Sequence, residues 1–180
     1  MTFDKSDEQL IRLTEGKISE DIATDVLTNK KCATVSAKEF ANKKIELMQG
    51  LPARPMRHIV DLLSIANAMK LKVVIVTGSD NNWVEFILHS LQITQYVDAV
   101  VTANDVTMGK PSAEPYRIGL EKIQINPMYA IAVENAPLGI DSAHNAGLYC
   151  IGLTSTLSEK ELFFADECIS SFSELISILN

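Results

Sequence analysis

Hydrophobic residues follow two different patterns along the chain, and the change falls near residue 51. Before that point, apolar residues recur three and four positions apart among charged residues, which predicts amphipathic helices. Ser36 opens one such helix as an N-cap, and Gly50 is placed to end it. Two prolines in Leu51–Pro55 then interrupt the helical pattern. We therefore expect a small helical cap in residues 1–50 and a second region in residues 51–180.

The second region alternates between short apolar runs rich in β-branched residues and longer amphipathic segments. The short runs predict strands, and the longer segments predict helices. The expected strands are Val73–Val76, Tyr96–Thr102, Tyr129–Val133, Tyr149–Leu153 and Glu167–Ile169, and the expected helices are Met56–Met69, Trp83–Leu91, Ala113–Ile123, Pro137–Ala146 and Phe172–Leu179. Helices between buried strands give right-handed crossovers and a parallel sheet. The sequence thus predicts an α/β fold with a doubly wound, Rossmann-like sheet.

Composition narrows the kind of ligand. The net charge of −7 argues against a broad nucleic-acid surface, because a phosphate backbone requires positive charge. No apolar stretch reaches the roughly 18 residues that a membrane span needs, and the acidic N-terminus is unlike a signal peptide. Cys32, Cys150 and Cys168 lack the spacing of a disulfide framework or a zinc site. We expect a soluble cytoplasmic protein with a small ligand and no nucleic-acid or membrane partner.

Three predicted strand ends carry polar residues that suit a phosphorylated ligand. The segment Thr77-Gly78-Ser79 lies between a strand and a helix, where a hydroxyl and free N–H groups can bind an anion. Lys110 lies just before another helix and can reach a phosphate as a compact charge. Glu134 and Asn135 follow a third strand, and their oxygens suit magnesium. Because the carboxyl ends of parallel strands meet at one edge, these residues can form one site.

Several of these residues also have a purely structural interpretation. Ser79 could simply cap the helix that follows, and Glu134 could be a turn acid. Asp141 lies one turn into a helix, where an acid favours the helix dipole in any case. The histidines have no paired ligand spacing, so we expect them on the surface or partly buried; they are His58, His89 and His144.

The order and spacing of the polar segments resemble the haloacid dehalogenase superfamily. Thr77-Gly-Ser, Gly109-Lys-Pro-x-x-x-Pro-Tyr and Val133-Glu-Asn-Ala-Pro-x-Gly-Ile-x-Ser-Ala-x-x-Ala-Gly look like its motifs two, three and four. The segments Asp7–Leu10 and Ser36–Phe40 further look like the cap of its β-phosphoglucomutase-like branch. The resemblance covers essentially the whole chain.

The resemblance implies a magnesium-dependent phosphatase or sugar phosphomutase that acts on a small phosphorylated metabolite. It implies catalytic roles for Lys110 and Thr77, a phosphate site that adds Gly78 and Ser79, and a metal site at Glu134 with a weaker contribution from Asn135. Lys17 falls in the region where related mutases contact substrate, although a solvated lysine is an equal interpretation.

The chain departs from the family at two positions. Family members begin with a strand that ends in Asp-x-Asp-Gly, which supplies the nucleophile and the general acid–base, and this sequence has no Asp-x-Asp. The one candidate, Asp4, has three residues before it, too few for a buried strand of ordinary length. Asn135 also stands where members usually carry a second acid. We expect a member that is inactive by itself; the alternatives are a catalytically dead relative that binds a phospholigand or a protein, and one part of a complemented assembly.

The strand that carries Asp-x-Asp would be central in the sheet, between Val73–Val76 and Ala130–Val133. Without it, two rows of backbone groups in the core lack partners, unless those strands pair directly or another chain supplies a strand. We therefore expect an altered sheet, with strand exchange or self-association into a homo-oligomer.

Overall fold

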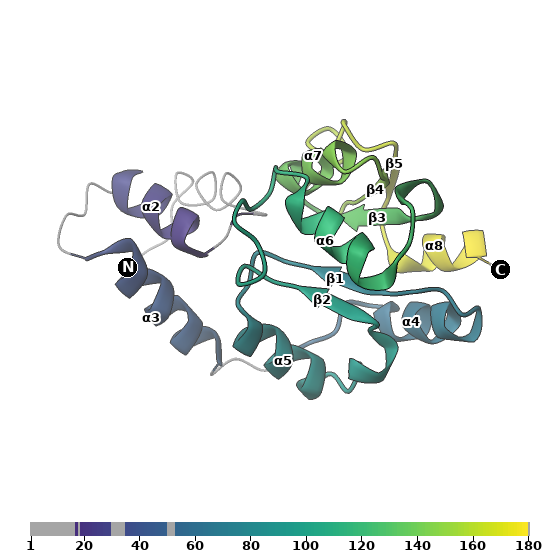
Figure 1. Ribbon diagram of the computed structural model, residues 1–180, viewed down its shortest axis with the longest axis horizontal. Helices are drawn as coiled ribbons and strands as arrows, with labels where there is room; N and C mark the ends of the chain where they lie inside the picture. The colour runs from purple at the N-terminus through teal and green to yellow at the C-terminus, as the bar shows by residue number, and fades with distance from the viewer. Residues whose placement is uncertain (1–16, 18, 30–34, 50–52, 180) are drawn as a thin grey trace.

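A computed structural model of the chain describes residues 17, 19–29, 35–49 and 53–179. The described residues form an α/β fold in which helices alternate with parallel strands, as the sequence predicts (Figure 1). Asp4, the segment Asp7–Leu10 and Cys32 lie outside the described residues.

The elements follow the predicted order. The helices are α2 (Ser19–Asn29), α3 (Ala37–Gln49), α4 (Ile59–Ala68), α5 (Asn81–Ser90), α6 (Glu114–Ile123), α7 (Pro137–Asn145) and α8 (Phe172–Leu179), with 3-10 turns η1 (Thr94–Tyr96) and η2 (Pro127–Tyr129). The strands are β1 (Val74–Val76), β2 (Ala99–Val101), β3 (Ile131–Glu134), β4 (Tyr149–Leu153) and β5 (Glu167–Ile169). The bounds of β4, β5 and α8 are the predicted ones.

Several local predictions were wrong, among them the strand Tyr129–Val133: its first residue belongs to the turn η2, and the strand β3 begins at Ile131. Helix α4 begins at Ile59 and not at Met56, because His58 has a φ of 65° and so cannot continue a right-handed helix. The predicted strand Tyr96–Thr102 is shorter, because its first residue belongs to the turn η1. Asp80 rather than Ser79 caps α5, since its Oδ1 accepts a hydrogen bond from the Trp83 N–H at 3.1 Å.

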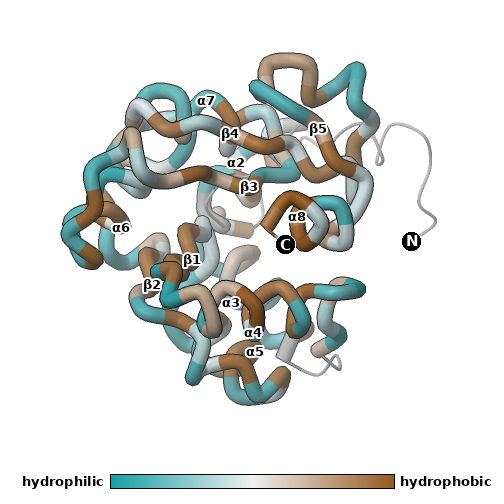
Figure 2. The backbone as a smooth tube through the Cα atoms, turned by 90° about the vertical axis from the view of Figure 1, so that its right-hand side faces the viewer, coloured by the Kyte–Doolittle hydropathy of each residue, from teal (hydrophilic) through white to brown (hydrophobic). Residues whose placement is uncertain are grey.

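The strands form two separate parallel sheets. One sheet has the order β1-β2, and the other has the order β3-β4-β5. The registers align Val74 with Ala99 in the first sheet and Ile131 with Tyr149 in the second. Strands β1 and β3 are not hydrogen-bonded to each other, and Figure 2 shows the two groups of strands apart. Direct pairing of these two strands, one of the arrangements that the sequence analysis allowed, is therefore not seen among the described residues.

Helices cover both faces of the two sheets and hold them together. Helices α6 and α7 lie on one face, where Tyr116 and Ile140 pack with Ala132 and Cys150 of the strands. Helices α4, α5 and α8 lie on the other face in two clusters of buried residues. Ile59 of α4 packs against both of these clusters, so α4 joins the two halves of the core.

Helices α2 and α3 pack against each other beside the α/β body, and α3 approaches α5 (Figure 1). Ser36 and Glu39 form a capping box at the start of α3: the Glu39 N–H donates to Ser36 Oγ, and the Ser36 N–H donates to Glu39 Oε2 at 2.9 Å. This confirms Ser36 as the start of the helix. No helix in the described part of the chain is long and apolar enough to cross a membrane.

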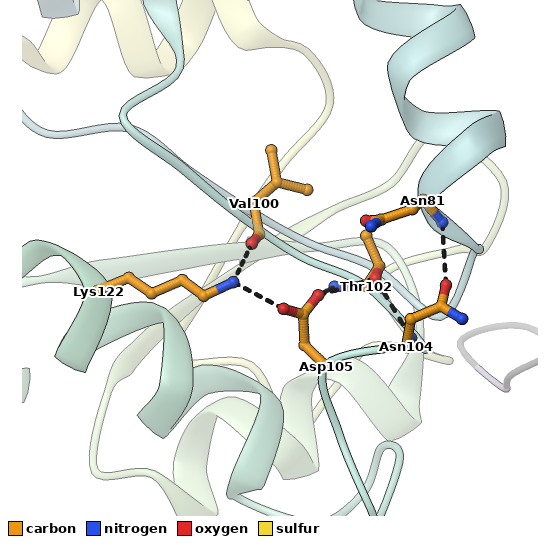
Figure 3. A network of polar contacts seen from close by, with 6 residues as sticks. All are labelled: Asn81, Val100, Thr102, Asn104, Asp105 and Lys122. Carbon is orange, nitrogen blue, oxygen red and sulfur yellow. Dashed lines mark hydrogen bonds and ion pairs between the residues drawn. The ribbon is translucent and has the colours of Figure 1, made fainter.

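A polar network fixes the loop after β2 (Figure 3). Asp105 accepts hydrogen bonds from the N–H and hydroxyl of Thr102, at 2.9 and 2.8 Å, and from Lys122 of α6 at 2.8 Å. Lys122 also donates to the Val100 carbonyl at 2.7 Å, so α6 is tied to β2. These bonds stabilise the charged carboxylate, and they lower the pKa of Asp105 from 3.8 to about 2.

We expect Asp105→Asn to destabilise the fold in a pH-dependent way. Because the pKa of Asp105 is lower in the folded chain than in the unfolded chain, its stabilisation is full above about pH 4 and is lost as pH falls towards about 2. The difference in melting temperature between wild type and variant should shrink over the same interval. The exposed Glu121→Gln on the same helix is the control, and a difference that stays constant from pH 7 to pH 2 would contradict the assignment.

Candidate active site

A cleft of about 660 Å³ opens at the carboxyl ends of β1 and β3. It brings together the three segments that the sequence analysis singled out. The residues of these segments that line it are Thr77, Gly78, Ser79, Lys110, Glu134 and Asn135. Lys17, Ile22 of α2 and Lys44 of α3 line it as well. The predicted site residues therefore meet at one edge, as parallel strand topology requires.

Lys110 and Glu134 form a buried ion pair at the centre of the cleft. The ammonium contacts Glu134 Oε1, and each side chain is only 8% exposed. Lys110 Nζ also donates to the Val76 carbonyl at 3.2 Å, and it lies 5.4 Å from the centre of the Tyr116 ring. The peptide bond between Lys110 and Pro111 is cis. Lys110 thus presents positive charge where three segments of the chain converge.

Tyr116 of α6 is a second partner of Glu134. Its hydroxyl donates to Glu134 Oε1 at 2.6 Å, and the residue is buried. Burial, together with the neighbouring Glu134 carboxylate, raises the pKa of Tyr116 far above its ordinary value, so the phenol stays protonated and remains a donor. The Glu134 carboxylate is therefore held by a cation and a neutral donor on the same oxygen.

Gly139 in the first turn of α7 makes room for that carboxylate. A Cβ at this position would lie 2.1 Å from Glu134 Oε2, far inside van der Waals contact. No other residue fits there unless Glu134 moves. Sequence reasoning quoted Gly139 and Tyr116 as parts of motifs but gave neither a role at the site. Both residues lie in the first turn of a helix that begins at the cleft, and this position is the feature of the sequence that could have predicted a role for them.

The Thr77–Ser79 loop carries hydroxyl and backbone groups into the cleft. Thr77 Oγ1 accepts a hydrogen bond from the Ser79 N–H at 3.1 Å, which folds the loop back on itself. The Thr77 N–H donates to the Val101 carbonyl, and the Ser79 carbonyl accepts from the Ala103 N–H, both at 2.9 Å. The loop is thereby anchored to β2 and to the residues after it.

The described residues offer an incomplete metal site. Glu134 and Asn135 supply oxygen atoms, but the Asn135 amide also donates to Thr156 Oγ1 at 3.1 Å. The part of the chain that the structure describes contains no group of three or more acidic, histidine or cysteine side chains that could hold a metal ion. Magnesium would need further oxygen ligands from outside these residues.

The remaining candidates are accounted for by local contacts. Lys17 lines the cleft and forms an ion pair with Asp25 at 2.5 Å. The pKa of Lys44 is lowered because burial disfavours its charged form, although the nearby Asp80 opposes the effect. Cys150 is fully buried, and burial raises the pKa of its thiol to about 12, with Glu134 adding to the rise. Cys150 is thus a core residue, as expected, and not a nucleophile.

The chain belongs to the haloacid dehalogenase-like hydrolase family, whose model matches residues 2–153. It is 30% identical over 173 residues to validoxylamine A 7'-phosphate phosphatase of Streptomyces hygroscopicus subsp. limoneus, covering 94% of this chain and 80% of that protein. It is also 30% identical over 125 residues to phosphoglycolate phosphatase of Salmonella choleraesuis, covering 68% of this chain and 50% of that protein.

Solved structures share the fold. CbbY from Rhodobacter sphaeroides, solved in complex with phosphate, aligns with a TM-score of 0.84 at 23% identity, covering 97% of this chain and 81% of that one. A β-phosphoglucomutase from Clostridium difficile aligns with a TM-score of 0.81 at 20% identity, covering 96% and 81%. The predicted likeness to the β-phosphoglucomutase-like branch is confirmed at the level of fold.

We expect substitutions of Lys110 and Glu134 to have strongly coupled effects on the free energy of unfolding. Lys110→Met should destabilise the fold by about 3–5 kcal/mol, because it leaves the Glu134 carboxylate buried without its cation. Adding Glu134→Gln should recover most of that loss, since the double variant has no uncompensated charge. Urea unfolding of the two single variants and the double variant measures the coupling.

The exposed pair Lys43–Glu46 is the matched control, with side chains 61% and 66% exposed. Its Lys43→Met variant should change the free energy of unfolding by less than about 1 kcal/mol. Additive effects of Lys110→Met and Glu134→Gln would show that the two side chains are not coupled.

Proposed function

We propose that the cleft binds the phosphate group of a small phosphorylated metabolite and that the reaction class is phosphate-ester hydrolysis or phosphoryl transfer on a sugar phosphate. One observation carries the proposal: the Thr77–Ser79 loop and Lys110 line one cleft, although they come from separate connections after β1 and β2. A hydroxyl, backbone N–H groups and a buried ammonium are suitable donors for a phosphate. The family and the phosphatase relatives support the same class of ligand.

Within this proposal, Lys110 and Thr77 hold the phosphoryl group and stabilise the charge on its oxygens. Gly78 contributes its backbone N–H group and Ser79 its hydroxyl, because the Ser79 N–H is already bonded to Thr77 Oγ1. Lys17 and Lys44 line the same cleft and are placed to contact the rest of the substrate. When bound, magnesium would neutralise phosphate charge, and Glu134 with Asn135 would contribute to holding it. The free thiols of Cys150 and Cys168 support a cytoplasmic location.

We further propose that the chain binds phosphate without turning it over by itself. The sequence has no Asp-x-Asp, and Glu134, the one carboxylate among the described residues that line the cleft, is held by Lys110 and Tyr116. A carboxylate held in this way is a poor nucleophile, because attack would require it to leave both partners. This favours, as the alternative function, a relative that binds a phospholigand without catalysis.

Removing the two proposed phosphate donors should weaken binding of inorganic phosphate. We expect Thr77→Val, which keeps the shape but loses the hydroxyl, to raise the dissociation constant by about fivefold to tenfold. Lys110→Met should raise it by more than about tenfold, because a charge-assisted bond is lost. Isothermal titration calorimetry measures both, and the exposed Lys160→Met is the control. Unchanged affinity in both variants would show that phosphate binds at a site other than Thr77 and Lys110.

The chain with magnesium should not hydrolyse p-nitrophenyl phosphate above the blank, because no free carboxylate among the described residues faces the cleft. Release of p-nitrophenol is the readout. Activity that Asp4→Ala abolishes and Lys160→Met preserves would contradict this prediction, and it would assign the attacking carboxylate to Asp4.

A further inference from the structure

Tyr116 contacts both members of the buried ion pair in the cleft. Its hydroxyl donates to Glu134 Oε1 at 2.6 Å, and the centre of its ring lies 5.4 Å from Lys110 Nζ. Among the described residues, Tyr116 and Lys110 are the two side chains that donate to the Glu134 carboxylate, and both bond to the same oxygen. Tyr116 is therefore placed to affect how strongly Glu134 competes for the Lys110 charge.

The Lys110 ammonium keeps one donor for a ligand. It carries three N–H groups, of which one donates to the Val76 carbonyl at 3.2 Å and one to Glu134 Oε1. In the part of the chain that the structure describes, no acceptor is bonded to the third. Because Lys110 lines the cleft, an anion there can bond to this third N–H while Glu134 stays in place.

An anion on this donor would share one cation with the Glu134 carboxylate, and the two negative charges would repel each other. The Lys110 and Glu134 side chains are each 8% exposed, so water screens this repulsion only weakly. The Tyr116 hydroxyl reduces it, because the hydrogen that lies against Glu134 Oε1 carries partial positive charge. Since this one donor is used by Glu134, Tyr116 acts on the anion only through that carboxylate.

The surroundings hold Tyr116 and Glu134 in contact. The Tyr116 ring packs in the core cluster with Ala132 and Ile140, so α6 fixes its position. On the other side of the carboxylate, the backbone of α7 lies so close that a Cβ on Gly139 would be 2.1 Å from Glu134 Oε2. The hydrogen bond between Tyr116 and Glu134 is thus built into the packing of two helices and does not depend on a ligand.

We propose that Tyr116 is a positioning residue for phosphate binding: its hydroxyl holds the Glu134 carboxylate and offsets part of its charge, so that Lys110 can serve the phosphate. This inference rests on the proposed function, because it concerns the same phosphate site. Thr77 and Lys110 contact the phosphate, whereas Tyr116 changes the affinity through Glu134.

Calorimetric titration of inorganic phosphate, in buffer without magnesium, tests this role. Tyr116→Phe keeps the ring and removes the hydroxyl, so it should raise the dissociation constant by about threefold to tenfold. Glu134→Gln should lower the dissociation constant by at least about threefold, because the phosphate then has Lys110 to itself. In the Glu134→Gln background, adding Tyr116→Phe should change the dissociation constant by less than about twofold. Tyr129→Phe is the matched control, since Tyr129 is 80% exposed, and it should bind phosphate as wild type does.

A second comparison needs no substitution of Glu134. The repulsion from Glu134 grows with the charge of the ligand, and at about pH 8 methyl phosphate carries about two negative charges and dimethyl phosphate about one. Tyr116→Phe should therefore weaken binding of methyl phosphate by a larger factor than binding of dimethyl phosphate, as measured by NMR titration. Circular dichroism shows whether each variant is folded, and this comparison carries the test if Glu134→Gln unfolds.

Each of three results would overturn the inference, and they have different meanings. Wild-type affinity in Tyr116→Phe would show that the hydroxyl has no part in binding, while the phosphate site at Thr77 and Lys110 stands. An equal loss of affinity from Tyr116→Phe with and without Glu134→Gln would show that the phenol supports the fold and does not act through Glu134. A wild-type chain that binds no phosphate would overturn the proposed function, and this inference with it.

Discussion

The contact on which the described structure most depends is the one that Lys110 makes across the two sheets. Its ammonium bonds to the Val76 carbonyl at the end of β1 and to the Glu134 carboxylate at the end of β3. Among the described residues, no ladder of backbone hydrogen bonds joins these strands, and the buried Lys110 ammonium makes a polar connection between them. The apolar contacts of α4, α6 and α8 complete the link on both faces.

The same ion pair governs what the cleft can do chemically. A phosphate that enters must share Lys110 with Glu134, because the ammonium is already neutralised in its absence. In the Thr77–Ser79 loop, the N–H groups of Thr77 and Ser79 already donate to the Val101 carbonyl and to Thr77 Oγ1, so the hydroxyls and the Gly78 N–H are the donors that we propose for an anion. The residues that we propose as anion donors line the described cleft, whereas the one carboxylate among the described residues that line it is held by Lys110 and Tyr116.

Much of the fold and the site could be predicted from the sequence, and the failures have specific causes. The strand pattern placed β4, β5 and α8 to the residue and brought Thr77, Lys110 and Glu134 to one edge. Periodicity could not show that His58 adopts a left-handed conformation or that Tyr96 belongs to a turn, because both are decided by tertiary context. Nor could it show that Gly139 exists to make space for Glu134, since that contact joins a strand end to a helix.

The division into two sheets has a consequence for how the molecule opens. Strands β1 and β2, with α5 between them, form one continuous stretch of chain, and β3 to β5, with α7, form another. Each half has its own hydrogen-bonded ladder, and in the part of the chain that the structure describes the halves are joined by side-chain packing and by Lys110 rather than by a ladder. Two such units are free to unfold with different local stabilities, so cooperativity across the domain rests on the helices that bridge them and not on the sheet.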